Sequence, residues 1–541
     1  MFDRNSKAFG VHEVSGSSPL GPIHFPLFPY RLWCAAAGAP HSASRSLGKL
    51  LCLAGLLGLM SGSASLAGVP QRPNIVLIIA DDMARDDCGA YGNRKIKTPH
   101  IDRLAREGMR FDRAFVTASS CSPSRSSIIT GRYPHSTGAE ELHWPLPADQ
   151  ITFVEKLKAA GYWAAAAGKW HLGSAVKNRF NLVREAGTAG FQLPTGNDAK
   201  PKMTARGPGA AQSGCDHWLS VLRDRPRDKP FFLWLASFDP HRDYQAGTIP
   251  EPHRAEDVTV PTYLPDVPEV RQDLAMYYDE ISRLDHYVGE VLAELDRQKV
   301  AGDTLVLFVS DNGRPFPRCK TTLYDSGIKT PLIVRWPGHV RPGSHCDSLV
   351  STIDIAPTFL GLAGVATGPS FQGKDFSVLL GNPKAKVRDL IFAERNWHDY
   401  SAHGRAVRSE RFTYIRNDDH ELPLTPPADA VRSPTFVAMR RLRDERKLSP
   451  AQMACFVRPR PVEELYDADA DPDELVNLTG DPKYAEVLDT LRRGLLDWEK
   501  ETDDRLPASL SPDEFDCETG APLPGRVCPR LKKPASPTSS R

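Results

Sequence analysis

One cysteine stands in a segment whose pattern is typical of the start of a helix. Cys121 lies two residues before Pro123, and Gly131 follows further along the segment. Proline is favoured in the first turn of a helix, a serine such as Ser122 is a good N-cap, and glycine commonly follows the helix end. Cys121 is therefore predicted to lie at the positive end of a helix dipole, which favours anions. Arg125 should lie on the same face, where its guanidinium suits a tetrahedral oxyanion.

The residues around Cys121 leave three interpretations open. The cysteine could be a buried structural residue, a thiolate activated by the helix end and Arg125, or a residue that another enzyme modifies. Spacing and elementary physical chemistry do not distinguish between the last two.

Polar side chains follow four apolar runs that are predicted to be strands. The runs are residues 75–80, 162–167, 231–238 and 304–310. The polar residues that follow them are, in the same order, Asp81 and Asp82, Lys169 and His171, Asp239 and His241, and Asp311 and Asn312. Ligand sites in open α/β sheets lie at the carboxyl ends of the strands, so we expect these side chains to share one crevice.

Four of these residues offer only hard oxygen ligands. They are Asp81, Asp82, Asp311 and Asn312. Such a set suits Ca²⁺ or Mg²⁺ better than zinc. Any one of them alone could equally cap a helix or close a turn, but the four together favour a metal site.

The elements that must position these residues indicate an α/β fold. Residues 72–385 alternate apolar runs with helical patterns, which predicts a large domain with a mostly parallel sheet between helices. Residues 269–295 carry an apolar stripe at helical spacing. A smaller C-terminal α+β domain is expected over residues 386–506, with strands near 390–393 and 412–415 and a helix over 484–498. Residues 422–461 are predicted to be irregular, and the Pro-rich tail, 507–541, to be loop or partly disordered.

The first 71 residues have the features of a leader. Arg45 and Lys49 precede an apolar run over residues 50–60, and small residues follow over 61–68. These are the three parts of a secretory signal peptide, which predicts a mature start near residues 65–70 and export to the periplasm or the medium. The run is short for a membrane span, although a membrane anchor or an uncleaved helix stays an alternative.

Charge and cysteine content narrow the classes of partner. There are 68 basic and 67 acidic residues, a net charge of +1, which argues against a nucleic-acid-binding surface. Of the ten cysteines, Cys34 and Cys52 lie in the leader, and Cys517 with Cys528 is the favoured disulfide. The sequence does not fix the oligomeric state, and a homodimer is compatible with it.

The segment Cys121-Ser122-Pro123-Ser124-Arg125, followed by Thr130-Gly131, resembles the Cys-x-Pro-x-Arg signature of the formylglycine-dependent sulfatases. That family has an alkaline-phosphatase-like fold, and the resemblance covers roughly residues 72–500. Further motifs occur in the family's order, namely Asp81-Asp82, Gly168-Lys169-Trp170-His171, Asp239-Pro240-His241-Arg242, Ser310-Asp311-Asn312-Gly313 and Leu465-Tyr466-Asp467. The chain is most similar to the heparan N-sulfatase group, with Lys320 where that group carries arginine.

The resemblance implies a role for each matching residue. A maturation enzyme would oxidise Cys121 to formylglycine, whose hydrate would complete the shell of a calcium ion and attack sulfur with one hydroxyl. Arg125 and Lys169 would neutralise the diol oxygens, and His171 would take the proton that expels sulfate. His241 and Lys320 would bind sulfate and protonate the leaving group. Asp239, Arg242 and His398 are weaker candidates for substrate contact.

The implied activity is hydrolysis of sulfate groups on a sulfated saccharide. The N-sulfate of glucosamine in heparan-type chains is the favoured target. The alternatives are an O-sulfatase on another sulfated glycan, a phosphonate or phosphodiester hydrolase, and a non-catalytic glycan binder if Cys121 stays unmodified.

Overall fold

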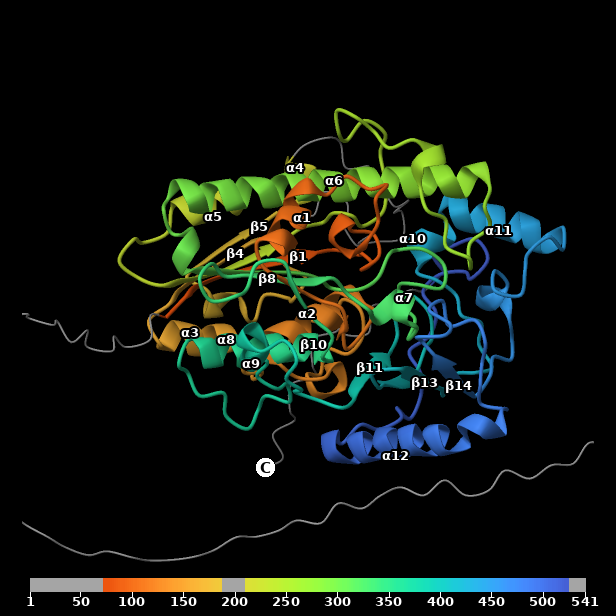
Figure 1. The fold of residues 1–541 in the computed structure, drawn as a ribbon. Helices are drawn as coiled ribbons and strands as arrows, with labels where there is room; N and C mark the ends of the chain where they lie inside the picture. The colour runs from red at the N-terminus through yellow and green to blue at the C-terminus, as the bar shows by residue number, and fades with distance from the viewer. Residues whose placement is uncertain (1–71, 187–209, 525–541) are drawn as a thin grey trace, which may run out of the picture. The chain divides into compact units, whose positions relative to one another are not determined.

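The computed structural model describes residues 72–186 and 210–524 (Figure 1). In these ranges the central element is an eight-stranded sheet. In spatial order its strands are β5 (Leu182–Glu185), β4 (Trp163–Gly168), β6 (Phe231–Ala236), β1 (Asn74–Ala80), β7 (Thr304–Ser310), β8 (Leu332–Arg335), β2 (Met109–Phe111) and β9 (Ser344–Cys346). The five strands from β5 to β7 pair in parallel, and β8 is antiparallel to both of its neighbours. The sheet is therefore mostly parallel, as predicted.

Helices cover both faces of this sheet (Figure 1). One layer contains α1 (Pro99–Arg106), α4 (Ala210–Ser213), α5 (Trp218–Arg223) and α6 (Pro268–Arg297). The other contains α2 (Cys121–Thr130), α3 (Phe153–Ala159), α8 (Ile355–Leu362) and α9 (Ser377–Gly381). Alternate residues of β1 point to opposite layers, because Val76 packs with Ile281 of α6 whereas Leu77 packs with Phe153 of α3. A strand buried on both faces is apolar at every position, which is the pattern that predicted β1.

A second, antiparallel sheet lies in the C-terminal part of the chain. Its strands are β11 (Ile391–Arg395), β12 (Gly404–Arg408), β13 (Phe412–Asn417) and β14 (Glu463–Asp467). Helix α12 (Ala485–Thr502) packs on one face through Leu491 and Trp498. The opposite face packs on Phe115 of the short pair β3 (Ala114–Phe115) and β10 (Val350–Ser351), and on Ile328 of α7 (Asp325–Ile328). The sheet agrees with the predicted C-terminal α+β part, and the boundary at residue 385 stays a prediction.

The prediction that residues 422–461 are irregular is wrong in part. They contain α10 (Ala428–Val431) and α11 (Pro434–Asp444). Ser433 caps α11, because its Oγ accepts the N–H of Phe436 at 3.2 Å, and Pro434 occupies the first turn. Phe436 and Met439 then pack in the same core as α6. The Pro- and Arg-rich composition gave no clear signal for α11, and packing against α6 stabilises this helix.

The described part of the tail, residues 507–524, lies against the loop that follows β11. Trp397 Nε1 donates to the Pro512 carbonyl at 2.9 Å, and Ser511 Oγ donates to the Glu141 carboxylate at 2.7 Å. Cys528 and the leader lie outside the described residues, so the predicted disulfide and signal peptide stay predictions. Within residues 72–186 and 210–524, no helix is both long and apolar enough to cross a membrane.

Candidate active site

Helix α2 places Cys121 at its first position. Ser120 is the N-cap, with extended backbone at φ −156°, so the prediction that Ser122 caps the helix is wrong. Ser122 Oγ instead accepts the backbone N–H of His143 at 2.8 Å. Gly131 ends the helix in the left-handed region at φ 63°, as glycine allows. Cys121 therefore lies where the unpaired N–H groups of a helix begin.

The strand ends meet at Cys121. Its Sγ lies 3.4 Å from Asp81 Oδ1 and 3.6 Å from Asp82 Oδ1, both at the end of β1. Lys169, which follows β4, forms an ion pair with Asp81. Lys320 Nζ lies 2.7 Å from Asp82 Oδ2. The structure thus brings the cysteine, two acids and two lysines together. Asp81, Asp82 and Lys169 were expected from the strand ends, and Lys320 from the family resemblance.

Arg125 and the residues after β7 complete the floor of the site. The guanidinium of Arg125 is fully buried. Its Nε donates to Asp311 Oδ2 at 2.8 Å, and its Nη2 forms an ion pair with the same oxygen at 2.7 Å. Asn312 Nδ2 donates to Asp82 Oδ1 at 2.7 Å. A buried guanidinium needs such a partner, because an unpaired buried charge is strongly unfavourable.

The pKa values of the buried carboxylates at this site shift in different directions. Burial raises the pKa of Asp311 to about 7, against the opposing charge of Arg125. Burial also raises the pKa of Asp81, but its cationic neighbours, Lys169 foremost, outweigh this and hold it well below its usual value. The site therefore concentrates carboxylates that repel one another unless cations lie between them.

These acids fit a divalent metal ion. Ligand atoms of Asp81, Cys121 and Asp311 lie within 4.8 Å of one another, and so do those of Asp82, Cys121 and His241. Asn312 Oδ1 is buried and has no hydrogen-bond partner among the described residues. Hard oxygen atoms in this arrangement suit Ca²⁺ or Mg²⁺, which would also offset the repulsion between the carboxylates.

The environment of Cys121 argues against an activated thiolate. Burial raises the pKa of its thiol well above the ordinary value, although Lys169 and Lys320 oppose that shift. A thiol that stays protonated is a weak nucleophile. Of the chemical interpretations that the sequence left open, modification of the residue is therefore favoured.

Two histidines flank the cysteine. His241 Nδ1 donates to the Arg242 carbonyl at 2.5 Å, and its Nε2 faces Asp82 Oδ2 at 3.8 Å. Burial, followed by the charge of Lys320, lowers the pKa of His241 to about 3. His171 Nε2 lies 2.8 Å from His143 Nδ1, and burial lowers the pKa of His171 well below its usual value. Both rings are therefore neutral bases in this environment.

Two residues of the site have a backbone conformation that is uncommon outside glycine. Asp82 has φ 72° and His171 has φ 54°. The Asp82 N–H donates to Asp311 Oδ1 at 3.2 Å, which holds this turn in place. Such left-handed positions cost free energy and concentrate at functional sites. Here they turn the chain sharply after a strand, so that the side chains enter the crevice.

The three weaker substrate-binding candidates have partners within the protein. Asp239 bonds Arg283 through both carboxylate oxygens, at 2.8 and 2.6 Å. Arg242 bonds Asp273 in the same way, at 2.8 and 2.7 Å. His398 Nδ1 lies 2.7 Å from Ser120 Oγ, at the start of α2. His398 is thus next to the predicted site, and the substrate contacts of all three stay predictions.

Sequence reasoning missed two polar residues at this site. His143 contacts His171 but lies in a loop without a strand before it. Asp429 Oδ2 lies 3.9 Å from His241 Nε2, and its helix α10 belongs to the stretch predicted to be irregular. Neither residue carried a signal of its own, because tertiary contacts alone bring them here.

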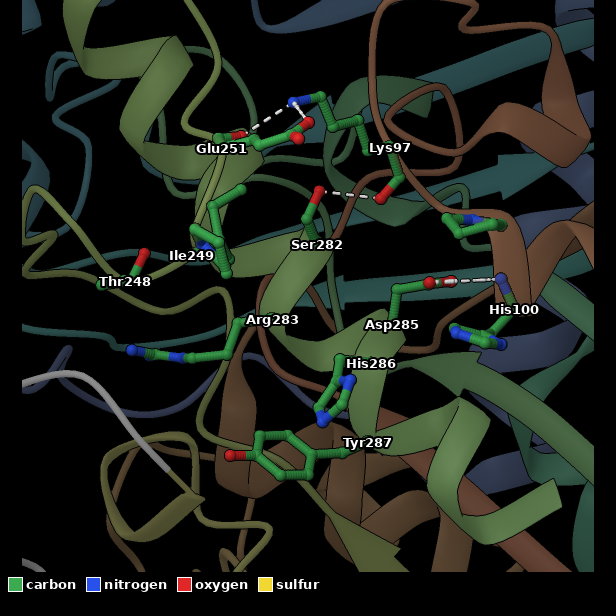
Figure 2. A pocket seen from close by; sticks show the side chains of 12 residues that line it. Lys97, His100, Thr248, Ile249, Glu251, Ser282, Arg283, Asp285, His286 and Tyr287 are labelled. Carbon is green, nitrogen blue, oxygen red and sulfur yellow. Dashed lines mark hydrogen bonds and ion pairs between the residues drawn. The ribbon is translucent and has the colours of Figure 1, made fainter. Parts of the chain in front are cut away.

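Figure 2 shows a different pocket, of about 460 Å³, between the start of α1 and the middle of α6. It is lined by Lys97, His100, Ser282, Arg283 and His286, among others, and by none of the predicted site residues. Arg283 connects it with the end of β6, because its guanidinium pairs with Asp239.

The sheet, with oxygen atoms at its strand ends that could hold a metal ion, has the alkaline-phosphatase-like architecture. The fold is similar to that of BT4656 in complex with its substrate D-glucosamine-2-N,6-O-disulfate (TM-score 0.60, 21% identity, 82% of this chain and 100% of that chain). It is also similar to the phosphonate monoester hydrolase of Agrobacterium radiobacter (TM-score 0.60, 19% identity, 80% of this chain and 96% of that chain).

Sequence comparisons identify the family. The sulfatase family model matches residues 73–365, and the model of the N-sulphoglucosamine sulphohydrolase C-terminal region matches residues 318–422. The chain is 33% identical to the N-sulphoglucosamine sulphohydrolase of Homo sapiens (82% of this chain, 92% of that one). It is 32% identical to an ulvan-active sulfatase of Formosa agariphila (80% of this chain, 75% of that one). The chain belongs to the sulfatase family and is a hydrolase of sulfate esters or sulfamates.

Proposed function

We propose that this protein is an exported sulfatase that removes sulfate groups from a sulfated saccharide, with the N-sulfate of glucosamine as its preferred target. The observation that carries the proposal is the position of Cys121, at the start of α2 between the acids of β1 and the cations Lys169 and Lys320. The similarity to a human N-sulphoglucosamine sulphohydrolase over most of both chains supports the choice of target.

Each residue of the site has its own role in the proposed reaction. When present, formylglycine at position 121 would supply an oxygen nucleophile, and the Asp81, Asp82, Asp311 and Asn312 oxygens would hold a calcium or magnesium ion that polarises sulfate. Lys169 and Arg125 offset negative charge beside position 121. Lys320 lies on the Asp82 side, where its Nζ–H can bind a sulfate oxygen and protonate the leaving group. His171 is a neutral base that can accept a proton from position 121.

An O-sulfatase is the second candidate. Lysine at position 320, where the heparan N-sulfatase group carries arginine, and the similarity to an ulvan-active sulfatase both favour it. Initial rates on N-sulfoglucosamine, an O-sulfated glucosamine and a phosphodiester separate the candidates. We expect the sulfamate to be hydrolysed fastest, and a faster phosphodiester reaction would contradict a sulfatase role.

Mass spectrometry of the tryptic peptide that contains Cys121 tests the proposal directly. In protein from its native host, conversion to formylglycine should make the peptide about 18 Da lighter than the cysteine form. Cys121→Ala should abolish hydrolysis of all sulfated substrates. An unmodified thiol in protein that nevertheless hydrolyses sulfate would refute the formylglycine mechanism, and an unmodified thiol without hydrolysis would refute the enzyme.

A further inference from the structure

Asp429 stands at the mouth of the active site, apart from the buried acids. Its side chain is 15% exposed, whereas those of Asp82 and Asp311 are fully buried. Asp429 Oδ1 accepts the backbone N–H of Ala430 at 2.7 Å. Its Oδ2 points to His241 Nε2 at 3.9 Å, on the side of the site that also holds Lys320. One carboxylate oxygen therefore faces His241, on the side where Lys320 is proposed to protonate the leaving group.

The position of Asp429 is fixed by the short helix α10. Asp399 Oδ2 accepts the N–H of Ala428, the first residue of that helix, at 2.9 Å. Asp399 follows His398, which is hydrogen-bonded to the N-cap of α2. A chain of contacts thus ties Asp429 to the helix that carries Cys121, and a positioned side chain binds with less loss of conformational entropy.

Asp429 differs chemically from the other acids of the site. The two clusters that could hold a metal contain Asp81, Asp82 and Asp311 but not Asp429. The Oδ2 atom of Asp429 therefore provides a carboxylate acceptor on the Lys320 side of the site, outside the clusters that could hold a metal ion.

A carboxylate acceptor at this place discriminates between the two kinds of sulfate group. The bridging nitrogen of a sulfamate carries a hydrogen atom that can be donated, whereas the bridging oxygen of a sulfate ester carries none. A site built to accept from a substrate N–H rejects an analogue that lacks it, because its own polar groups are then left unpaired.

We propose that Asp429 selects N-sulfated over O-sulfated substrates by accepting a hydrogen bond from the sulfamate N–H, an inference that rests on the proposed sulfatase function. During hydrolysis the S–N bond would break with its electron pair left on nitrogen, while a new S–O bond forms. The nitrogen would take up one proton, equal to the proton that the attacking oxygen gives up. The product amine takes a second proton from water, and the Asp429 carboxylate stabilises the resulting ammonium group.

The test compares Asp429→Asn with wild-type holoenzyme on N-sulfoglucosamine and on para-nitrophenyl sulfate. We expect kcat/KM for the sulfamate to fall about 10-fold, because the acceptor loses its charge and the hydrogen bond is weakened. The rate on the aryl sulfate should change less than about threefold, which also shows that the variant is folded and modified. The control is Asp497→Asn, the same change on the exposed face of α12, which should alter neither rate.

Two results would overturn the inference, and they can be told apart. If wild-type protein hydrolyses the sulfamate and Asp429→Asn lowers both rates equally or neither, Asp429 does not select the substrate, and the proposed function stands. If wild-type protein hydrolyses the aryl sulfate but not the sulfamate, the proposed N-sulfate target fails, and the role of Asp429 fails with it.

Discussion

At the scale of single residues, the site is a cluster of buried charges, each stabilised by neighbours of opposite sign. Three carboxylates and three cations surround Cys121 with almost no exposure to solvent. Each buried charge has a partner of opposite sign, as in the pair of Arg125 with Asp311. The same burial raises the pKa of the Cys121 thiol, so that cysteine itself is a poor nucleophile here.

Removal of divalent metal should destabilise the protein. The Asp311 carboxylate, with its pKa raised to about 7, gains most from a bound cation. At a free metal concentration of 100 times Kd, binding contributes about 2.7 kcal/mol to the folded state. We expect chelation to lower the melting temperature and calcium to restore it, measured by thermal denaturation. Asn312→Ala should reduce the response to calcium. A melting temperature that is independent of metal would contradict the ligand assignment.

His143 should act as a positioning residue for His171. Its Nδ1 lies 2.8 Å from His171 Nε2, so the contact constrains the orientation of the His171 ring and couples the tautomers of the two rings. His143→Ala should lower kcat about 10- to 100-fold and shift the pH profile, with less effect on KM. The exposed His345 provides a matched control in His345→Ala. An unchanged pH profile would leave His143 with a structural role alone.

At the scale of elements, a side chain of one helix can accept hydrogen bonds from the unpaired N–H groups at the start of another. Helix α1 begins without a side-chain cap of its own, since Thr98 bonds Asp102 instead. Asp285, from the middle of α6, accepts the backbone N–H groups of His100 and Ile101, at 3.0 and 2.7 Å. Figure 2 shows this carboxylate pointing at His100. Asp285 of α6 therefore caps the start of α1 and connects these two helices of the same layer.

Replacement of Asp285 should weaken this junction. Asp285→Ala should lower the free energy of unfolding by about 1 to 2 kcal/mol, because two N–H groups of α1 lose their acceptor. Asp285→Asn keeps an acceptor and should cost less. Urea denaturation measures both, and sulfatase kcat should stay unchanged. Equal destabilisation by the two variants would show that the charge, not the cap, matters.

At the scale of the whole molecule, the small sheet is fastened to the large one by a buried ionic network. His135, in the loop after α2, bonds Glu394 of β11 at 2.6 Å. Arg405 of β12 pairs with Asp504, which follows α12. Burial lowers the pKa of His135, but Glu394 outweighs it, so that the net shift is upward. The network thus depends on the charge of His135.

The stability of this junction should depend on pH. A histidine whose pKa is raised on folding stabilises the protein fully below its unfolded pKa of about 6.5, and this contribution is lost as pH rises through the folded pKa. The free energy of unfolding of wild type relative to Glu394→Gln should therefore fall as pH rises above about 6.5, until pH exceeds the raised pKa of His135. Urea denaturation across that range measures it. A difference that stays constant with pH would contradict the role of His135.

Much of the fold could be predicted because its signals are local. The continuous apolar run of β1 and the stripe of α6 each follow from the periodicity of one segment, and Pro123 with Gly131 bounded a helix near Cys121. The cap of that helix and the existence of α11 were predicted wrongly. Ser120 and Ser122 are equally good caps in isolation, and α11 depends on its packing against α6.

The sequence by itself was enough to predict Cys121 near the start of a helix and polar residues at four strand ends, because parallel strands bring their carboxyl ends to one edge of a sheet. Only the tertiary structure decided which groups touch. It buried the thiol and so disfavoured a thiolate, it paired Asp239 with Arg283, and it brought His143 and Asp429 to the site from segments without a pattern of their own. Burial and pairing depend on residues far apart in the chain, and no local spacing encodes them.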